Sequence, residues 1–295
     1  MGQKTENNFI IKFNGGLGNQ MFQFAFARAL ETKTGVSVIM DMSFFDKKYS
    51  RPYELDVFKA KVSKVEDFWT KLKLSLIWQF RKKLQGKKLM GLGFYCEPHF
   101  QFDLTLFRLS PNTYIEGFFQ SEKYFSLIKE DIRNFFQFKS KPDEFNQHLI
   151  DTIANSNSVS LHIRRGDYVQ KKRYQNLYAT CSLDYYKKGV EYIAEKTANP
   201  KLFIFSDDTS WVKQNLNLPY ECIFVSNNSG AKSYEDMRLM SLCKHNIIAN
   251  SSFSWWGAWL NNNKEKIVIA PKKWFNDEKI IQTDVIPETW VRLDN

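Results

Sequence analysis

The stretch that decides the fold is VSLHIRRGDY, residues 159–168. Its first residues favour a buried strand, and side chains on a strand point alternately to opposite faces. His162 and Arg164 therefore share one face, and Arg165 takes the other unless the strand ends there. Gly166 indicates that the strand does end there, in a turn. The pattern predicts a cationic cluster at the carboxyl end of a buried strand, where open α/β sheets bind ligands.

Two interpretations of the arginines are open. A guanidinium group binds two phosphate oxygens at once, which favours a phosphate ligand. The alternative is an ion pair between Arg164 or Arg165 and Asp167, with no ligand.

Composition narrows the class of protein. A chain of 295 residues with 43% hydrophobic residues is large enough for two domains with proper cores. The net charge of +10 favours an anionic partner, which could be a nucleotide, a nucleic acid or an acidic membrane surface. The four cysteines form no Cys-x-x-Cys pair, so neither a zinc site nor a redox motif is indicated. We expect no signal peptide and no transmembrane helix, because the N-terminus is polar and apolar runs are short.

A glycine-rich turn follows the first predicted strand. Residues 9–13 favour a strand, NGGLGNQ follows at residues 14–20, and apolar residues recur at helical spacing over 21–34. A strand, a glycine-rich turn and a helix can cradle an anion with the amides at the helix start. Neither the P-loop pattern nor the dinucleotide pattern is complete, because Met21 occupies the third glycine position of the latter. The glycines could therefore serve only a tight turn.

The rest of the chain alternates between strand and helix patterns. Strands are predicted at 36–40, 114–118, 202–205, 221–225, 246–249 and 267–270, and helices at 121–136, 183–197, 234–243 and 253–261. This alternation indicates an α/β fold with mostly parallel sheets. A boundary at residues 139–145 divides the chain into an N-terminal domain, 1–145, and a C-terminal domain, 146–295.

Residues 68–89 have the pattern of a basic amphipathic helix. Such a helix can lie on an anionic membrane. A helix packed on its own domain with a solvated basic side has the same pattern, and we favour it.

Three polar groups are placed to bind a ligand. Asp207 and Asp208 follow a strand and could hold a divalent metal, although the first also sits where a helix N-cap is expected. In SSFSWWGAW, residues 251–259, hydroxyls and helix-start amides converge, as a phosphate requires. Asp236, at the start of a helix, could bind a guanine or ribose edge or be solvated.

Four motifs occur in this order: NGGLGNQMFQ at 14–23, HIRRGDY at 162–168, FSDD at 205–208 and SSFSWWGAWL at 251–260. Their combination resembles the bacterial α-1,2-fucosyltransferases of glycosyltransferase family 11, over about residues 9–275. The resemblance implies a GT-B architecture of two facing Rossmann-like domains with GDP-L-fucose between them. It implies an inverting transfer of L-fucose from GDP-β-L-fucose to O-2 of a terminal galactose, in O-antigen or surface glycan synthesis.

The resemblance also implies roles for individual residues. Arg164 would grip the β-phosphate and stabilise the leaving GDP, and Asp167 is a candidate base that could instead only orient the arginines. Substrate or nucleotide binding is assigned to ten further residues: Gly18, Asn19, Gln20, His162, Arg165, Asp208, Asp236, Ser251, Ser252 and Phe253. No essential metal and no other cofactor are expected.

The expected partners are GDP-fucose and a galactose-terminated oligosaccharide or lipid-linked glycan. We expect no nucleic acid, a weak association with a membrane surface at most, and a cytoplasmic enzyme that could be peripheral at the inner membrane. Two rival functions are a nucleic-acid-binding protein, for which no module is present, and a different GDP-sugar enzyme such as a protein O-fucosyltransferase or an α-1,6-fucosyltransferase.

Overall fold

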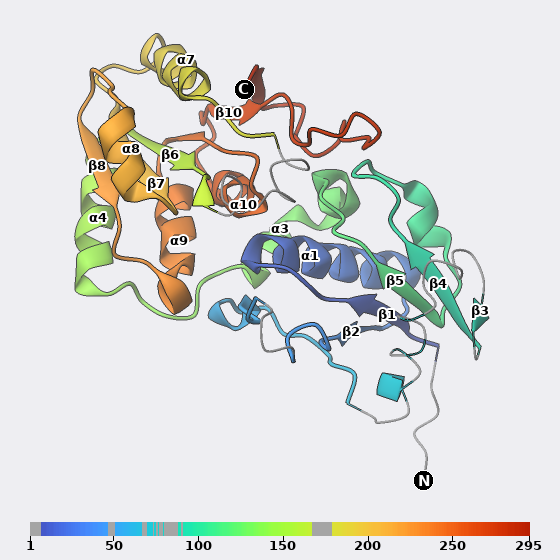
Figure 1. Cartoon of the computed structure of the whole chain (residues 1–295). Helices are drawn as coiled ribbons and strands as arrows, with labels where there is room; N and C mark the ends of the chain where they lie inside the picture. The colour runs from blue at the N-terminus through green and yellow to red at the C-terminus, as the bar shows by residue number, and fades with distance from the viewer. Residues whose placement is uncertain are drawn as a thin grey trace. The chain divides into compact units, whose positions relative to one another are not determined.

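The structure is a computed structural model that describes residues 7–46, 51–66, 70–72, 74, 76, 79, 88, 89, 91–166 and 179–295. The chain forms two compact units (Figure 1). Unit 1 comprises Met1–Gln137 and Thr283–Val285, and unit 2 comprises Phe138–Gln282 and Ile286–Asn295.

The change of unit after Gln137 differs from the predicted boundary after residue 145. The segment between these positions is bonded to unit 2. The ammonium group of Lys232 donates to Asp143 at 2.9 Å, and the guanidinium group of Arg238 donates to the carbonyl of Ser140 at 2.9 Å. These contacts attach the segment to the C-terminal half of the chain.

Unit 1 contains a sheet of order β2-β1-β5-β4-β3. Its strands are β1 (Phe9–Lys12), β2 (Val38–Asp41), β3 (Lys88–Leu89), β4 (Leu92–Cys96) and β5 (Thr113–Glu116). β1, β2, β4 and β5 run parallel, and β3 pairs antiparallel with β4. The sequence did not predict β3 and β4, because these strands are short and two glycines interrupt the apolar pattern.

Among the described residues of unit 1, the helices with defined bounds are α1 (Leu17–Thr34), α3 (Lys129–Phe135) and the 3-10 segments η1 (Leu55–Val57), η2 (Leu104–Arg108) and η3 (Glu122–Ile128). Helix α1 begins at Leu17, earlier than the predicted residue 21. The amides of Asn19 and Gln20 both donate to the carbonyl of Gly16, at 3.0 and 3.1 Å. The glycine-rich segment is therefore largely the first turn of the helix.

The predicted helix over residues 68–89 lies mostly outside the described residues. The described positions between 70 and 79 are helical, whereas Lys88 and Leu89 form β3. Leu74 is buried in a cluster with Ile10, Phe94 and Tyr114. This contact is the one expected of a helix packed on its own domain.

Many phenylalanines of unit 1 form its core. Phe26 stacks on Phe119 with ring centroids 4.0 Å apart, and Phe24 packs edge-on against Phe135 at 5.5 Å. The high phenylalanine content thus reflects ordinary core packing at these positions.

Unit 2 contains a parallel sheet of order β11-β10-β9-β6-β7-β8. Its strands are β6 (Ser158–Ile163), β7 (Lys201–Ser206), β8 (Cys222–Val225), β9 (His245–Ile247), β10 (Val268–Pro271) and β11 (Val291–Leu293). β6 is fully buried, as predicted. The C-terminal tail, read as irregular from the sequence, supplies the edge strand β11.

In the part of unit 2 that the structure describes, the helices are α4 (Glu144–Ala154), α7 (Leu183–Ala194), α8 (Thr209–Asn215), α9 (Tyr234–Leu242), α10 (Ser252–Leu260) and the short η4 (Gly230–Lys232). Helix α4 was not predicted, because its first residues were read as part of a linker. Asp143 caps it by accepting a hydrogen bond from the amide of Asn146.

Alternate residues of the central strands of unit 2 pack against different helices. Val159 and Leu161 of β6 lie in a cluster with residues of α7 and α8. Phe203 and Phe205 of β7 lie in a second cluster with residues of α4 and α9. His162 has the parity opposite to Leu161, so it faces the α9 and α10 side of the sheet.

The order of the strands reverses next to β6. The chain runs from β6 to β7 and β8 on one side, then returns to β9, β10 and β11 on the other. The carboxyl ends of β6 and β9 therefore flank the topological switch point of unit 2, where open α/β sheets bind their ligands.

Candidate active site

The two adjacent arginines follow β6 and are positioned by Asp207, which follows the neighbouring strand β7. Nη1 of Arg164 lies 3.1 Å from Oδ2 of Asp207. The backbone amide of Arg165 donates to Oδ1 of the same carboxylate at 2.9 Å. β6 and β7 are parallel with Ile163 paired to Ser206, so the residues that follow them meet at one edge. One carboxylate thus fixes both a guanidinium group and the adjacent backbone.

This ion pair is compatible with a ligand on Arg164. The side chains of Arg164 and Asp207 are 22% and 23% exposed. A guanidinium group has five N–H donors, so a carboxylate on one nitrogen does not saturate it. Asp167, the partner in the alternative ion-pair interpretation, lies outside the described residues, and its role as a base or an orienting group stays a prediction.

Gly166 allows Asp207 to approach this closely. A Cβ atom at position 166 would lie 2.4 Å from Oδ2 and 3.0 Å from Cγ of Asp207. No side chain is compatible with those distances unless the carboxylate moves. The glycine of the arginine motif therefore makes room for the group that positions Arg164.

Arg165 lies on the other side of the strand end, as the alternation of side chains predicts. Its guanidinium carbon stacks 3.4 Å from the ring centroid of Trp211 in α8, and its Nε lies 3.8 Å from Oδ2 of Asp208. Asp208 is the N-cap of α8, because its side chain accepts from the amide of Trp211. The sequence placed this cap at Asp207, one residue too early. The assignment of Arg165 and Asp208 to substrate binding stays a prediction.

His162 is buried beside the arginines. Burial, together with the charge of Arg164, lowers the pKa of His162 to about 4, so the ring is neutral at pH 7. Its Nδ1 atom is buried without a hydrogen-bond partner. The ring centroid lies 6.1 Å from that of Phe253 in α10. The histidine therefore brings an uncharged polar atom, not a second cation, to this edge of the sheet.

Helix α10 begins at the same edge, after β9. Ser251 is its N-cap residue, but the serine side chain makes no capping hydrogen bond. Ser252 and Phe253 form the first turn. Helix starts attract anions because their amides and the helix dipole both favour negative charge. The predicted phosphate-binding residues thus lie beside β6, which is the neighbour of β9.

The tryptophans of the same motif are core residues. Trp255 and Trp256 are fully buried, with ring centroids 5.0 Å apart. Trp255 also packs against Trp290 at 5.4 Å. These rings anchor α10 and hold its N-terminus in place.

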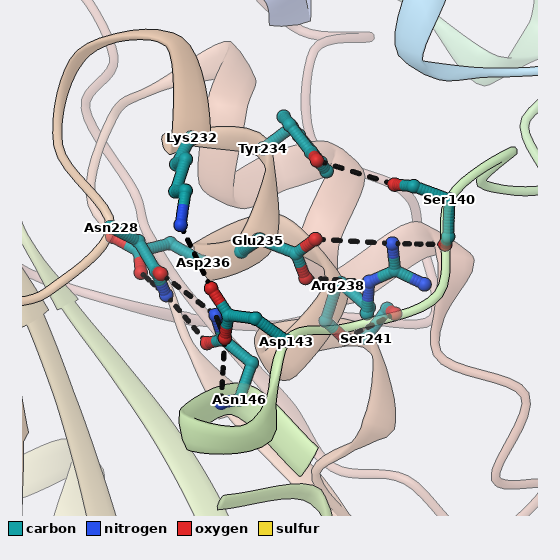
Figure 2. A network of polar contacts seen from close by, with 10 residues as sticks. All are labelled: Ser140, Asp143, Asn146, Asn228, Lys232, Tyr234, Glu235, Asp236, Arg238 and Ser241. Atoms are coloured by element: carbon teal, nitrogen blue, oxygen red, sulfur yellow. Dashed lines mark hydrogen bonds and ion pairs between the residues drawn. The ribbon is translucent and has the colours of Figure 1, made fainter.

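Asp236 lies in a network of polar side chains at the start of α9 (Figure 2). Its Oδ1 accepts from Asn228 at 2.9 Å, and Asn228 exchanges two hydrogen bonds with Asn146, of 2.8 and 3.0 Å. The neighbouring Glu235 is buried in an ion pair with Arg238, 2.7 Å from Nε. Burial raises the pKa of Asp236 to about 7. Its role in reading guanine stays a prediction, but the carboxyl group is held in a fixed orientation.

The predicted site residues of unit 1 lie in the first turn of α1. Gly18 and Asn19 are in this turn, and Oδ1 of Asn19 accepts from Nε2 of Gln120 at 2.9 Å. Gln20 is fully buried and donates to the carbonyls of Gly15 and Pro52 at 3.0 and 2.9 Å. These bonds make Gln20 a part of the fold of this turn, and its contact with a substrate stays a prediction.

Sequence reasoning did not identify Asp207 as the partner of the two arginines. Asp207 was weighed only as a metal ligand or a cap, because the sequence does not reveal that β7 is the neighbour of β6.

Among the described residues, no group of three or more histidine, cysteine, aspartate or glutamate side chains could hold a metal ion. In the same part of the chain, no helix combines the length and the apolar character needed to span a bilayer.

Two Rossmann-like α/β units, one with a guanidinium cluster at the carboxyl ends of its parallel strands, define the GT-B class of glycosyltransferases. A fold match agrees with this class: the fucosyltransferase NodZ from Bradyrhizobium has a TM-score of 0.52 at 15% identity, over 86% of this chain and 92% of that chain.

A family model described as Glycosyl transferase family 11 matches residues 1–294, and the chain belongs to this family. It is 33% identical to an alpha-1,2-colitosyltransferase of Escherichia coli, over 97% of this chain and 98% of the relative. It is 24% identical to galactoside alpha-(1,2)-fucosyltransferase 1 of Saimiri boliviensis boliviensis, over 50% of this chain and 42% of the relative. The protein is therefore a glycosyltransferase.

Proposed function

We propose that this glycosyltransferase moves L-fucose from GDP-β-L-fucose to O-2 of a terminal galactose, with inversion to an α-1,2 linkage. The observation that carries the proposal is the pair of arginines fixed by Asp207 at the carboxyl end of β6 in a family 11 chain. Two relatives, the alpha-1,2-colitosyltransferase and the galactoside alpha-(1,2)-fucosyltransferase, support the α-1,2 linkage, and the second also supports the galactoside acceptor and the fucose.

Arg164 supplies the main catalytic effect in this proposal. As the bond between the sugar and the β-phosphate breaks, negative charge grows on GDP. A donor fixed before the reaction stabilises that charge without a cost of reorganisation. Asp207 holds Arg164 from the protein side. The N-terminus of α10, with Ser251 and Ser252, adds amide and hydroxyl donors for the same diphosphate.

Asp236 binds the base of the nucleotide in this proposal. Guanine presents two adjacent N–H donors along its Watson–Crick edge, and a carboxylate can accept from both. Asn228 fixes one oxygen of Asp236. Because burial raises the pKa of Asp236 to about 7, we expect GDP to bind more tightly above pH 7, where the carboxylate prevails, than at pH 6.

The donor sugar has a second candidate. The 33% identical relative is a colitosyltransferase, and colitose is fucose without its 3-hydroxyl group. A site that binds this hydroxyl with buried polar groups rejects the deoxy sugar by a factor of about 10⁴–10⁵, whereas an apolar site discriminates poorly. The ratio of fucose transfer to colitose transfer therefore shows whether the site for the 3-hydroxyl group is polar or apolar.

The test is incubation of the purified protein with GDP-fucose or GDP-colitose and a set of galactose-terminated oligosaccharides, with the product linkage determined by NMR. We expect an α-1,2-linked product with GDP-fucose. A product formed only with GDP-colitose would show that the donor sugar is colitose and not fucose. Absence of transfer from both donors to every galactose-terminated acceptor would contradict the proposed reaction.

A further inference from the structure

Unit 1 contains a group of buried polar atoms that make no hydrogen bond within the protein. Three of them lie just after β4 and β5: Oε1 of Glu97, Nδ1 of His99 and Oε1 of Gln120. A buried polar atom without a partner costs about 1–3 kcal/mol of stability. Each such atom calls for an explanation, and a catalytic role or a bound water or ion is among those known.

Glu97 is the best-defined member of this group. Its Oε2 atom accepts from the amides of Phe118 and Phe119, at 2.7 and 3.0 Å. Its own amide donates to the carbonyl of Glu116 at 2.8 Å. A Cβ atom at Gly117 would lie 2.7 Å from Cβ of Glu97. The carboxyl group is thus held by one oxygen against the turn after β5, and the other oxygen has no protein partner.

The charge environment makes Glu97 a proton acceptor near neutral pH. Burial is the main reason that the pKa of Glu97 rises to about 7, and the negative charge of Asp103 adds to this rise. Tyr95 and Tyr124 are the other titratable groups near it, because the negative charge of Glu97 raises the pKa of each. Within the described residues Glu97 forms no ion pair, so no neighbouring cation lowers its pKa.

The position in the sheet agrees with a ligand site. In the order β2-β1-β5-β4-β3 the direction of winding reverses between β1 and β5. The turn after β5 bonds to the start of α1, because Gln120 donates to Asn19 and Gln23 donates to the carbonyl of Gly117. The carboxyl ends of β1, β4 and β5 are therefore together at the switch point of unit 1.

Aromatic side chains complete the site. The rings of Phe100 and Phe118 stack with centroids 6.1 Å apart and an angle of 10° between their planes. Both residues are partly exposed, as are Glu97 and His99. Presentation of the buried carboxyl oxygen to a ligand requires a side-chain rotation, and changes of rotamer are common on binding. Partly exposed aromatic rings with few polar groups are typical of a small-molecule site.

We propose that the carboxyl ends of β4 and β5 bind the acceptor sugar, and that Oε1 of Glu97 accepts the proton of the attacking hydroxyl group. The proposal rests on the proposed function. The acceptor oxygen forms its bond to the anomeric carbon, the bond from that carbon to the phosphate oxygen breaks, GDP leaves with the electron pair, and the hydroxyl proton passes to Glu97. Oε1 of Gln120 accepts from a second hydroxyl of the same sugar.

The neighbouring Glu116 does not fit this role, although its Oε2 is also buried without a partner. Its Oε1 lies 3.3 Å from the ammonium group of Lys12. The charge of Glu116 is therefore matched by a cation inside unit 1. Glu116 is the last residue of β5 and Glu97 follows the paired strand β4, so Glu116 offers a control for the same substitution.

The test uses the full chain with Glu97→Gln, which keeps the shape of the side chain, and Glu116→Gln beside it. Four quantities are measured: transfer from the donor that the wild type uses to a galactose-terminated oligosaccharide, slow hydrolysis of that donor without acceptor, the affinity for GDP, and the thermal unfolding midpoint. We expect Glu97→Gln to lower the kcat of transfer by a factor of about 10²–10⁴. Donor hydrolysis and GDP affinity should stay within about twofold of the wild type.

The pH profile separates a proton acceptor from a structural group. With the donor saturating at every pH, so that Asp236 does not contribute, kcat/KM of the wild type for the acceptor should rise with pH through a pKa near 7. This rising limb should be absent in Glu97→Gln and present in Glu116→Gln. An unchanged limb in Glu97→Gln, or equal losses of transfer and donor hydrolysis, would overturn the assignment of Glu97 alone. A wild type that transfers neither sugar would contradict the proposed function and, with it, this assignment.

Discussion

At the scale of single residues, one carboxylate organises the arginine motif. Asp207 contacts the side chain of Arg164 and the backbone of Arg165. Sequence reasoning identified the arginines because their type and order are informative by themselves. It did not identify Asp207 as their partner, since that contact depends on which strands are neighbours.

Replacement of Arg164 by alanine should abolish most of the transfer. Loss of one fixed donor to a developing negative charge costs about 3–4 kcal/mol, or a factor of about 10²–10³ in kcat. Steady-state kinetics with the preferred donor measures this. Arg108→Ala, at an exposed position in η2 of unit 1, is the matched control and should leave kcat unchanged. Near-normal turnover of Arg164→Ala would remove this residue from the mechanism.

Replacement of Gly166 by alanine should impair catalysis without a change of charge. The added Cβ atom displaces Asp207, which it would otherwise meet at 2.4 Å, and Arg164 loses its fixed position. A displacement of about 1 Å in a catalytic group can cost about 10²-fold in rate. The measurement is kcat together with the GDP affinity. The control is Gly16→Ala, where a Cβ atom meets nothing within 4 Å; its unfolding midpoint shows the effect on stability of replacing a glycine. A Gly166→Ala enzyme with normal activity would contradict the expectation.

At the scale of elements, the sequence predicted the buried strand, the helices around it and the edge at which the polar motifs meet. It did not predict α4 or β4. A proline at residue 142 made the start of α4 resemble a linker, and Gly91 and Gly93 interrupt the apolar pattern around β4. The bond of Asp143 to Lys232 and the pairing of β4 with β5 join segments that are distant in sequence, so local patterns do not reveal them.

A buried amide connects three elements of unit 2. Nδ2 of Asn246 in β9 donates to Ser160 of β6 and to the carbonyl of Met240 in α9, at 2.7 and 2.8 Å. Its Oδ1 accepts from Asn261 at 2.8 Å. Because β6 and β9 flank the proposed nucleotide site, this amide fixes the spacing of the site as well as the core.

Asn246→Ala should therefore lower the free energy of unfolding by about 2–4 kcal/mol, since each buried group that loses its partner costs about 1–3 kcal/mol. Urea unfolding measures this change. Asn227→Ala, at an exposed position, should stay within about 0.5 kcal/mol of the wild type. Equal stabilities of the two variants would show that the amide network is not essential.

At the scale of the whole molecule, three side chains with shifted pKa values predict how stability depends on pH. Burial raises the pKa of Glu97 and of Asp236 to about 7. Each contributes stability that is complete below the carboxyl pKa of the unfolded chain, about 4, and is lost as the pH rises through 7. Burial lowers the pKa of His162 to about 4. Its contribution is complete above about pH 6.5 and is lost as the pH falls through 4.

The ligand-free protein should thus lose stability between pH 5 and pH 8 relative to a Glu97→Gln/Asp236→Asn double variant. Each unit of pKa shift corresponds to about 1.4 kcal/mol, so the relative change should be a few kcal/mol. Urea unfolding at four pH values measures it. Parallel curves for the two proteins would contradict the raised pKa values. His162→Gln should instead remove a loss of stability that appears below pH 6.

The last residues of the chain have a consequence for any attempt to divide the protein. The polypeptide passes from unit 1 to unit 2 after Gln137, returns for Thr283–Val285 and leaves again at Ile286. Asp284 bonds to the amide of Phe102 and to Lys123 in unit 1, whereas Val291–Leu293 forms an edge strand in unit 2. A single proteolytic cut near residue 138 therefore yields no complete half: a gene fragment that ends there lacks the carboxylate that belongs to its own fold. Deletion of residues 287–295 would instead remove the edge strand β11 from unit 2.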